Sequence, residues 1–157
     1  MPGDSGGGKD ETHEERLDRE LMELLNELRV ALPGVQVLFA FLLTLPFTGR
    51  FGELSPVQRD VYFGTFCATT AATAFLLTPT AFHRLRWRRY DKERLLRLGN
   101  AMAILGLACL ALSIGGAVFL ITDVLFGKAG AAATAAVAAA LIVGLWFAYP
   151  LSRRVGD

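Results

Sequence analysis

The sequence predicts an all-α fold: an integral membrane four-helix bundle of two antiparallel hairpins, with an N-terminal cytoplasmic amphipathic helix. Three observations predict this fold. Of the 157 residues, 53% are hydrophobic, which is more than a soluble domain of this length covers with polar surface. The charges are segregated, so that long stretches hold none. Between two pairs of such stretches, residues 83–97 hold seven of the sixteen Lys and Arg residues, as expected of a loop that orients a membrane protein.

The polar N-terminal part precedes the first apolar stretch. Residues 1–11 are rich in Gly and acidic side chains, and we expect a disordered tail. Residues 12–29 are expected to form a cytoplasmic amphipathic helix that begins at Thr12 as N-cap. Its acidic face carries six carboxylates against three arginines. Its apolar face is a stripe at alternating spacings of four and three residues, formed by Leu17, Leu21, Leu24, Leu28 and Ala31.

The first hairpin is expected to pair membrane spans at about 30–47 and 61–82. The first span is uncharged and lies at the short end of what crosses about 30 Å of hydrocarbon. Pro33-Gly34 near its start should kink or restart the helix. The run Ser-Pro-Val-Gln from Ser55 has the spacing of a capping box and predicts the start of the second helix. That helix is rich in small and hydroxyl residues, which allow helices to approach closely.

The second hairpin is expected to pair spans at about 98–122 and 131–151, joined by a short turn from Asp123 to Gly130. The third span carries several Gly and Ala residues, and the fourth begins as an Ala-rich run and ends in aromatic residues. Aromatic side chains at such a position are typical of the membrane–water interface. The transmembrane domain therefore covers 30–152, and 153–157 form a short cytoplasmic tail.

The distribution of basic residues predicts the orientation. If the N-terminus is cytoplasmic, the inner segments hold thirteen of the sixteen Lys and Arg residues and the outer loops hold three. Inner loops of membrane proteins carry this excess of positive charge. The sequence therefore predicts that both termini face the cytoplasm.

Polar residues within or beside the spans are the candidate functional residues, because polar groups at membrane depth mark ion and substrate pathways. No ionisable group lies in the middle of a span, and no motif indicates a catalytic, cofactor-binding or metal site. The threonines of the second span either line a hydrated path in an oligomer or bond back to their own helix and serve packing; we favour packing. The candidates are Gln36, Thr69, Thr73, His83, Arg84, Asn100 and Asp123.

Two segments, Glu23 to Phe47 (ELLNELRVALPGVQVLFAFLLTLPF) and Leu76 to Arg89 (LLTPTAFHRLRWRR), resemble an uncharacterised family of small four-helix bacterial membrane proteins. The resemblance covers most of the chain beyond its first residues, and it implies that the entry to the first span and the His83–Arg84 corner matter to the common structure. Some members are labelled sodium:proton antiporters. Antiport needs a buried titratable carboxylate reachable from both sides, which the spans of this sequence lack.

We therefore expect a multi-pass protein of the bacterial inner (plasma) membrane that is not an enzyme, needs no cofactor and acts by association in the membrane. The alternative is an oligomeric ion channel or cation/proton transporter. The expected partners are anionic lipid headgroups at Arg84–Arg97 and other copies of the chain, with no nucleic acid. The acidic helix and the basic loop have opposite charge and are predicted to contact each other through weak, salt-sensitive pairs.

Overall fold

The computed structural model describes residues 13–85 and 92–148, and within these ranges all regular structure is helical. Three α-helices, α1 (His13–Thr44), α2 (Pro56–Leu85) and α3 (Lys92–Val143), are joined or followed by the short helices η1 (Leu45–Phe47), η2 (Gly49–Glu53) and η3 (Gly144–Ala148). The all-α class is confirmed. All three α-helices are long and apolar enough to cross a membrane, which fits the expected membrane class by length and composition. The expected bundle of four spans remains a prediction.

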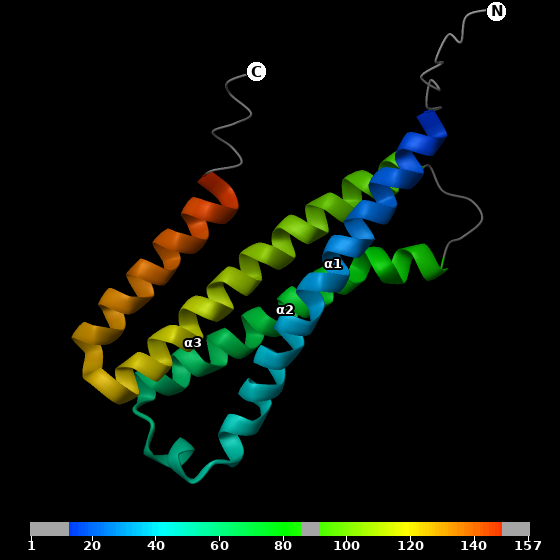
Figure 1. Ribbon diagram of the computed structural model, residues 1–157. Helices are drawn as coiled ribbons and strands as arrows, with labels where there is room; N and C mark the ends of the chain where they lie inside the picture. The colour runs from blue at the N-terminus through cyan, green and yellow to red at the C-terminus, as the bar shows by residue number, and fades with distance from the viewer. Residues whose placement is uncertain (1–12, 86–91, 149–157) are drawn as a thin grey trace, which may run out of the picture.

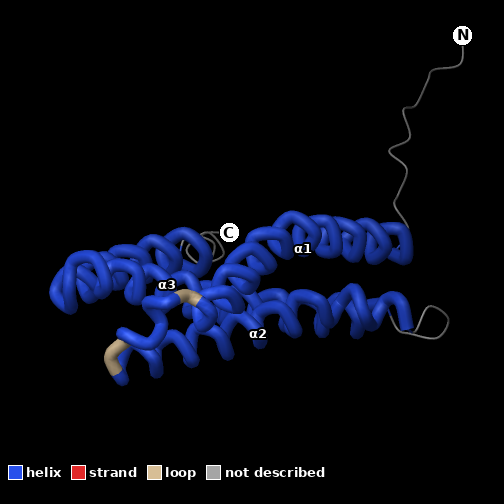
Figure 2. The backbone as a smooth tube through the Cα atoms, turned by 90° about the horizontal axis from the view of Figure 1, so that it is seen from below, coloured by secondary structure: helices blue, strands red, loops and turns tan. Residues whose placement is uncertain are grey.

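Helix α1 joins the expected amphipathic helix and the first span in one element (Figure 1). Pro33 lies in its interior, and the helix continues through it. The backbone bends along its length (Figure 2), as proline in a helix interior predicts. The predicted apolar stripe is confirmed: Leu21 and Leu28 are buried, and the same face continues every seven residues to Val35 and Leu42, which are also buried. The continuous stripe explains why the helix does not end at the proline.

Helix α2 begins with the predicted capping box. The Ser55 backbone N–H donates to Gln58 Oε1 at 2.9 Å, and the Gln58 N–H donates to Ser55 Oγ at 3.3 Å. Pro56 occupies the first helical position, where its missing N–H costs no hydrogen bond. The reciprocal bonds fix the point at which the chain leaves η2 and turns back along α1.

Helix α3 consists of two arms that meet at Gly127. The first arm is residues 92–126 and the second arm is residues 128–143. Gly127 has φ 76° and ψ 179°, a conformation that only glycine adopts without strain. At this residue the chain folds back, so that the second arm returns towards the end of the molecule from which the first arm came (Figure 1). The non-helical backbone is thus confined to one residue of the expected turn.

The core lies where α1, α2 and the first arm meet. Its buried residues recur at spacings of three, four and seven residues, the period of helices that wrap around each other with a left-handed twist. On α2 and the first arm the buried positions are Thr65, Thr69, Ala72, Leu76, Pro79, Gly99, Gly106, Leu110, Ser113 and Leu120. Leu28, Val35, Ala72, Leu76 and Leu110 form its apolar centre.

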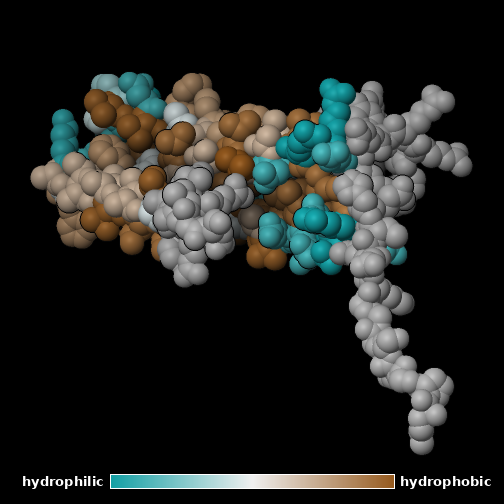
Figure 3. Space-filling model, turned by 90° about the horizontal axis from the view of Figure 1, so that it is seen from above, coloured by the Kyte–Doolittle hydropathy of each residue, from teal (hydrophilic) through white to brown (hydrophobic). Residues whose placement is uncertain are grey.

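Glycines of the first arm allow the helices to approach closely. A Cβ atom at Gly106 would lie 2.6 Å from Leu76 Cγ, and one at Gly116 would overlap the Thr65 hydroxyl. A Cβ at Gly99 would lie 3.2 Å from Leu24 on α1. Small residues at helix contacts are the usual device for tight packing inside a membrane. Seen from above, apolar residues dominate the middle of the molecule and hydrophilic ones gather towards its ends (Figure 3).

Candidate functional site

A pocket of about 820 Å³ lies between η1, η2, the ends of α1 and α2 that they connect, and the last turns of the first arm. Its walls are mostly apolar and include Phe41, Leu120 and Val124. Its polar members are Thr48, Arg50, Glu53, Gln58, Tyr62 and Asp123. Concave sites with apolar walls and a few polar groups are the usual form of small-molecule sites, and this pocket contains one of the predicted functional residues, Asp123.

Gln58 connects the start of α2 to Asp123 on the first arm. While its Oε1 accepts from the Ser55 N–H, its Nε2 donates to Asp123 Oδ2 at 2.7 Å. One side chain therefore caps its own helix and binds a carboxylate 65 residues away. A hydrogen bond to a charged acceptor is stronger than one between neutral groups, so this contact fixes Asp123 at the pocket wall.

An aromatic row of Phe51, Tyr62 and Phe66 lies beside the pocket, and Phe51 and Tyr62 line it. Tyr62 lies edge-on to Phe51, with 5.1 Å between ring centroids, and stacks loosely on Phe66 at 6.4 Å. Its hydroxyl donates to the Leu42 carbonyl at 2.8 Å. Edge-to-face aromatic pairs add stability beyond that which comes from the area they bury. The row therefore holds η2 against α1 and α2 and maintains the shape of the pocket.

Three charged side chains line the same pocket: Arg50, Glu53 and Asp123. Asp123 has one oxygen engaged by Gln58. Among residues 13–85 and 92–148, no ion pair or hydrogen bond engages the side chain of Arg50 or that of Glu53. The pocket thus presents one guanidinium and two carboxylates, and within the described part of the chain only one oxygen of Asp123 is engaged.

The threonines of α2 donate to their own helix. Thr69 Oγ1 donates to the Thr65 carbonyl at 2.8 Å, and Thr73 Oγ1 donates to the Thr69 carbonyl at 2.9 Å. Thr69 is fully buried and Thr73 is half-buried. Hydroxyls bonded back one turn are typical of packed helices rather than of a wetted surface, which agrees with the packing interpretation of this face.

The other predicted polar residues do not gather into one site. Gln36 on α1 and Asn100 on α3 are both exposed, and among the described residues no hydrogen bond joins them. His83 and Arg84 belong to the last turn of α2, but their side chains and residues 86–91 of the basic loop lie outside the described residues. The predicted lipid contacts of Arg84–Arg97 therefore remain predictions.

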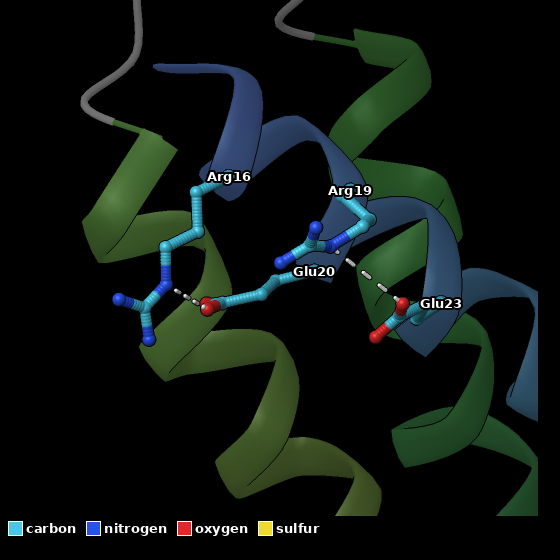
Figure 4. Close-up of polar contacts among 4 residues, drawn as sticks. All are labelled: Arg16, Arg19, Glu20 and Glu23. Carbon is cyan, nitrogen blue, oxygen red and sulfur yellow. Dashed lines mark hydrogen bonds and ion pairs between the residues drawn. The ribbon is translucent and has the colours of Figure 1, made fainter. Parts of the chain in front are cut away.

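The acidic part of α1 forms ion pairs along its own axis. Arg16 Nε lies 2.9 Å from Glu20 Oε1, and Arg19 Nε lies 3.9 Å from Glu23 Oε1 (Figure 4). These are exposed pairs four residues apart, and each stabilises a helix by only about 0.3–0.5 kcal/mol. The predicted contact of this helix with the basic loop falls partly on residues 86–91 and stays a prediction.

The second arm of α3 differs from the other helices in its exposure. Between residues 128 and 146 only Ala131 is buried. The outward face carries small residues at spacings of four, three and four, and all of them are exposed: Ala129, Ala133, Ala136 and Ala140. This is the spacing of a helix–helix seam with no helix of the described chain packed on it.

Sequence reasoning found Asp123 but missed its neighbours. Gln58 carried only a capping signal, and nothing in the local sequence links it to Asp123. Arg50 was counted only as one of the three basic residues of the outer loops, and Glu53 in the same loop was not considered. The one available signal was their joint position at the same end of two hairpins. Among the described residues, no group of three His, Cys, Asp or Glu side chains is placed to hold a metal ion.

A family model described as a family of unknown function (DUF6328) matches residues 10–150 of the chain. The match includes all the described residues, and the family description names no activity. Comparison with curated proteins and with solved structures found no match.

Proposed function

The chain belongs to this family of unknown function, DUF6328, and we propose that it is a non-enzymatic protein of the bacterial inner membrane that acts by self-association. The observation that carries the proposal is the outward alanine face of the second arm, Ala129, Ala133, Ala136 and Ala140, which is exposed throughout. Four membrane crossings, with both termini in the cytoplasm, place this face against lipid or against another helix.

The membrane position is supported by length, hydropathy and charge. At about 1.5 Å per residue, the 32 residues of α1 exceed the roughly 30 Å of the hydrocarbon core. The break at Gly127 divides α3, which is 52 residues long, into two arms. The first arm is long enough for one membrane crossing, and the second arm is slightly shorter than one crossing needs. Thirteen of sixteen basic residues then lie on the inner side. The basic residues from Arg84 to Arg97 meet anionic headgroups there.

Self-association follows from how helices pack in lipid. Lipid tails are as apolar as leucine, so exposure of apolar side chains alone gives no reason for helices to bind each other. Close approach through small residues does give one, because it adds dispersion contacts and excludes lipid. The alanine face has the same spacing as the first arm's own seam. It therefore suits the same face of a second copy, in a symmetric parallel pair, because both copies have the same orientation in the membrane.

Transport is less well supported than association. The Thr69 and Thr73 hydroxyls, which a hydrated path would need, donate to their own helix. Within the described residues no carboxylate lies in the seam between α1, α2 and the first arm. The described part of the seam therefore offers no carboxylate for ion exchange.

Single-molecule counting of labelled protein in liposomes tests the association. Across a dilution series in lipid, we expect the wild-type chain to shift from dimers to monomers. Ala133→Leu with Ala140→Leu fills the outward face and should move that transition to at least about tenfold higher protein density, since one lost close contact of about 1.4 kcal/mol corresponds to tenfold.

Ala132→Leu with Ala139→Leu is the matched control. These alanines are equally exposed, but at 100° per residue they lie well to one side of the outward face. The control should associate as the wild type does. Monomers at every density, or equal weakening by both pairs of substitutions, would rule the alanine face out.

A further inference from the structure

The pocket beside Asp123 lies at the loop end of the bundle, and none of its lining residues belongs to the alanine face. We propose that it binds the headgroup end of an aminophospholipid, with the phosphate at Arg50 and the ammonium group at Asp123 and Glu53. This inference rests on the membrane position proposed above, and it does not depend on self-association.

The charges of the pocket fit a zwitterion. Arg50 supplies a guanidinium, the group best suited to bind a phosphate in a fork. Asp123 retains an unengaged carboxylate oxygen and Glu53 a second carboxylate. Within the described residues, none of these groups neutralises another through an ion pair. A ligand with one anionic and one cationic group can pair with both the guanidinium and the carboxylates. An anionic lipid without an amine would instead leave the carboxylates facing a like charge.

The apolar walls fit the part of a lipid next to its headgroup. Phe41 at the end of α1, and Leu120 and Val124 on the first arm, line the pocket together with the aromatic ring of Phe51. Phe41 and Val124 are about half exposed, so a bound acyl chain would cover them. A soluble ion would leave this apolar surface uncovered, and its burial against an acyl chain stabilises the complex.

The depth of the pocket fits the same ligand. It lies where apolar helices end and charged residues begin, at η1 and η2 on one side and just before Gly127 on the other. A membrane protein places such a boundary at the level of the lipid headgroups. A lipid reaches this pocket from the bilayer without crossing the hydrocarbon core.

Native mass spectrometry of the delipidated full chain in detergent tests the proposal. The probes are phosphatidylethanolamine and phosphatidylglycerol with identical acyl chains. We expect one phosphatidylethanolamine to be retained at least about tenfold more tightly than phosphatidylglycerol, because charge-assisted hydrogen bonds contribute about 1.4 kcal/mol or more. Arg50→Gln and Asp123→Asn should each remove most of that preference.

The variants separate charge from structure. Asn at position 123 keeps an oxygen that accepts from Gln58, so the fold is retained while the charge is lost. Arg59→Gln and Asp60→Asn change exposed charges at the same end of the molecule but outside the pocket, and they should leave retention unchanged. Equal retention of the two lipids, or equal loss in the pocket and control variants, would overturn the proposal. So would displacement of the lipid by soluble glycerophosphoethanolamine at equal concentration. Because retention is measured on monomers, failure here leaves the association test unaffected.

Discussion

The two arms of α3 are similar in composition and opposite in packing. Both are apolar and rich in small residues, and they are continuous in sequence apart from the break at Gly127. The first arm buries Gly99, Gly106 and Ser113 against α1 and α2, whereas between residues 128 and 146 the second arm buries Ala131 alone. Small residues therefore form a seam only where a partner helix is present.

The difference shows that apolar composition alone does not decide which helix faces pack together. In water, exposed Val137 and Leu141 would be driven inward by the hydrophobic effect. In lipid that force between helices is absent, so close contact decides which helix faces pack together. Gly106 and Gly116 give the first arm contact with Leu76 and Thr65 that no larger residue permits. The second arm has the same kind of face, but no helix of the described chain packs on it. This exposed face is the basis of the association proposed above.

The largest expected effect comes from truncating a leucine on each side of this comparison. Leu76 is fully buried against the first arm, while Leu141 on the second arm is 59% exposed. Leu76→Ala should lower the free energy of unfolding by about 2–5 kcal/mol, because it removes buried contacts and leaves a cavity. Leu141→Ala should change it by less than about 0.5 kcal/mol. Unfolding of the monomer in detergent measures both. Similar losses from the two variants would mean that the second arm is packed within the chain.

Adjacent glycines of the first arm give a smaller and sharper contrast. A Cβ at Gly116 would collide with Thr65, whereas one at Gly115 meets no atom within 4 Å. Gly116→Ala should destabilise by about 1–3 kcal/mol through overpacking. Gly115→Ala should be neutral or stabilising by up to about 1 kcal/mol, since alanine favours a helix more than glycine does. Thermal unfolding of both variants checks this. A neutral Gly116→Ala would show that the seam is loose enough to adjust.

The sequence predicted the helical class, the apolar stripe of α1 and the capping box of α2, because these depend on local spacing. It did not predict that α1 runs unbroken through Pro33, since the continuous seam that supports it there is a tertiary contact. Asp123 was singled out, but its bond to Gln58 spans 65 residues and leaves no local signal. The same holds for the pairing of Gly116 with Thr65. Residues that face each other across helices are decided by register, which one sequence does not reveal.

The smallest expected effect concerns the hydroxyls inside the seam. Thr69→Val and Thr73→Val keep the side-chain shape and remove donors that bond only to carbonyls of their own helix, so each should change the free energy of unfolding by less than about 1 kcal/mol. If the seam is dry, liposomes with the double variant should show the same sodium, potassium and proton flux as liposomes with the wild type. Flux that is present in the wild type and lost in the double variant would instead make the seam a hydrated path. The first arm would then be the functional face of α3 and the second arm its lipid-facing support.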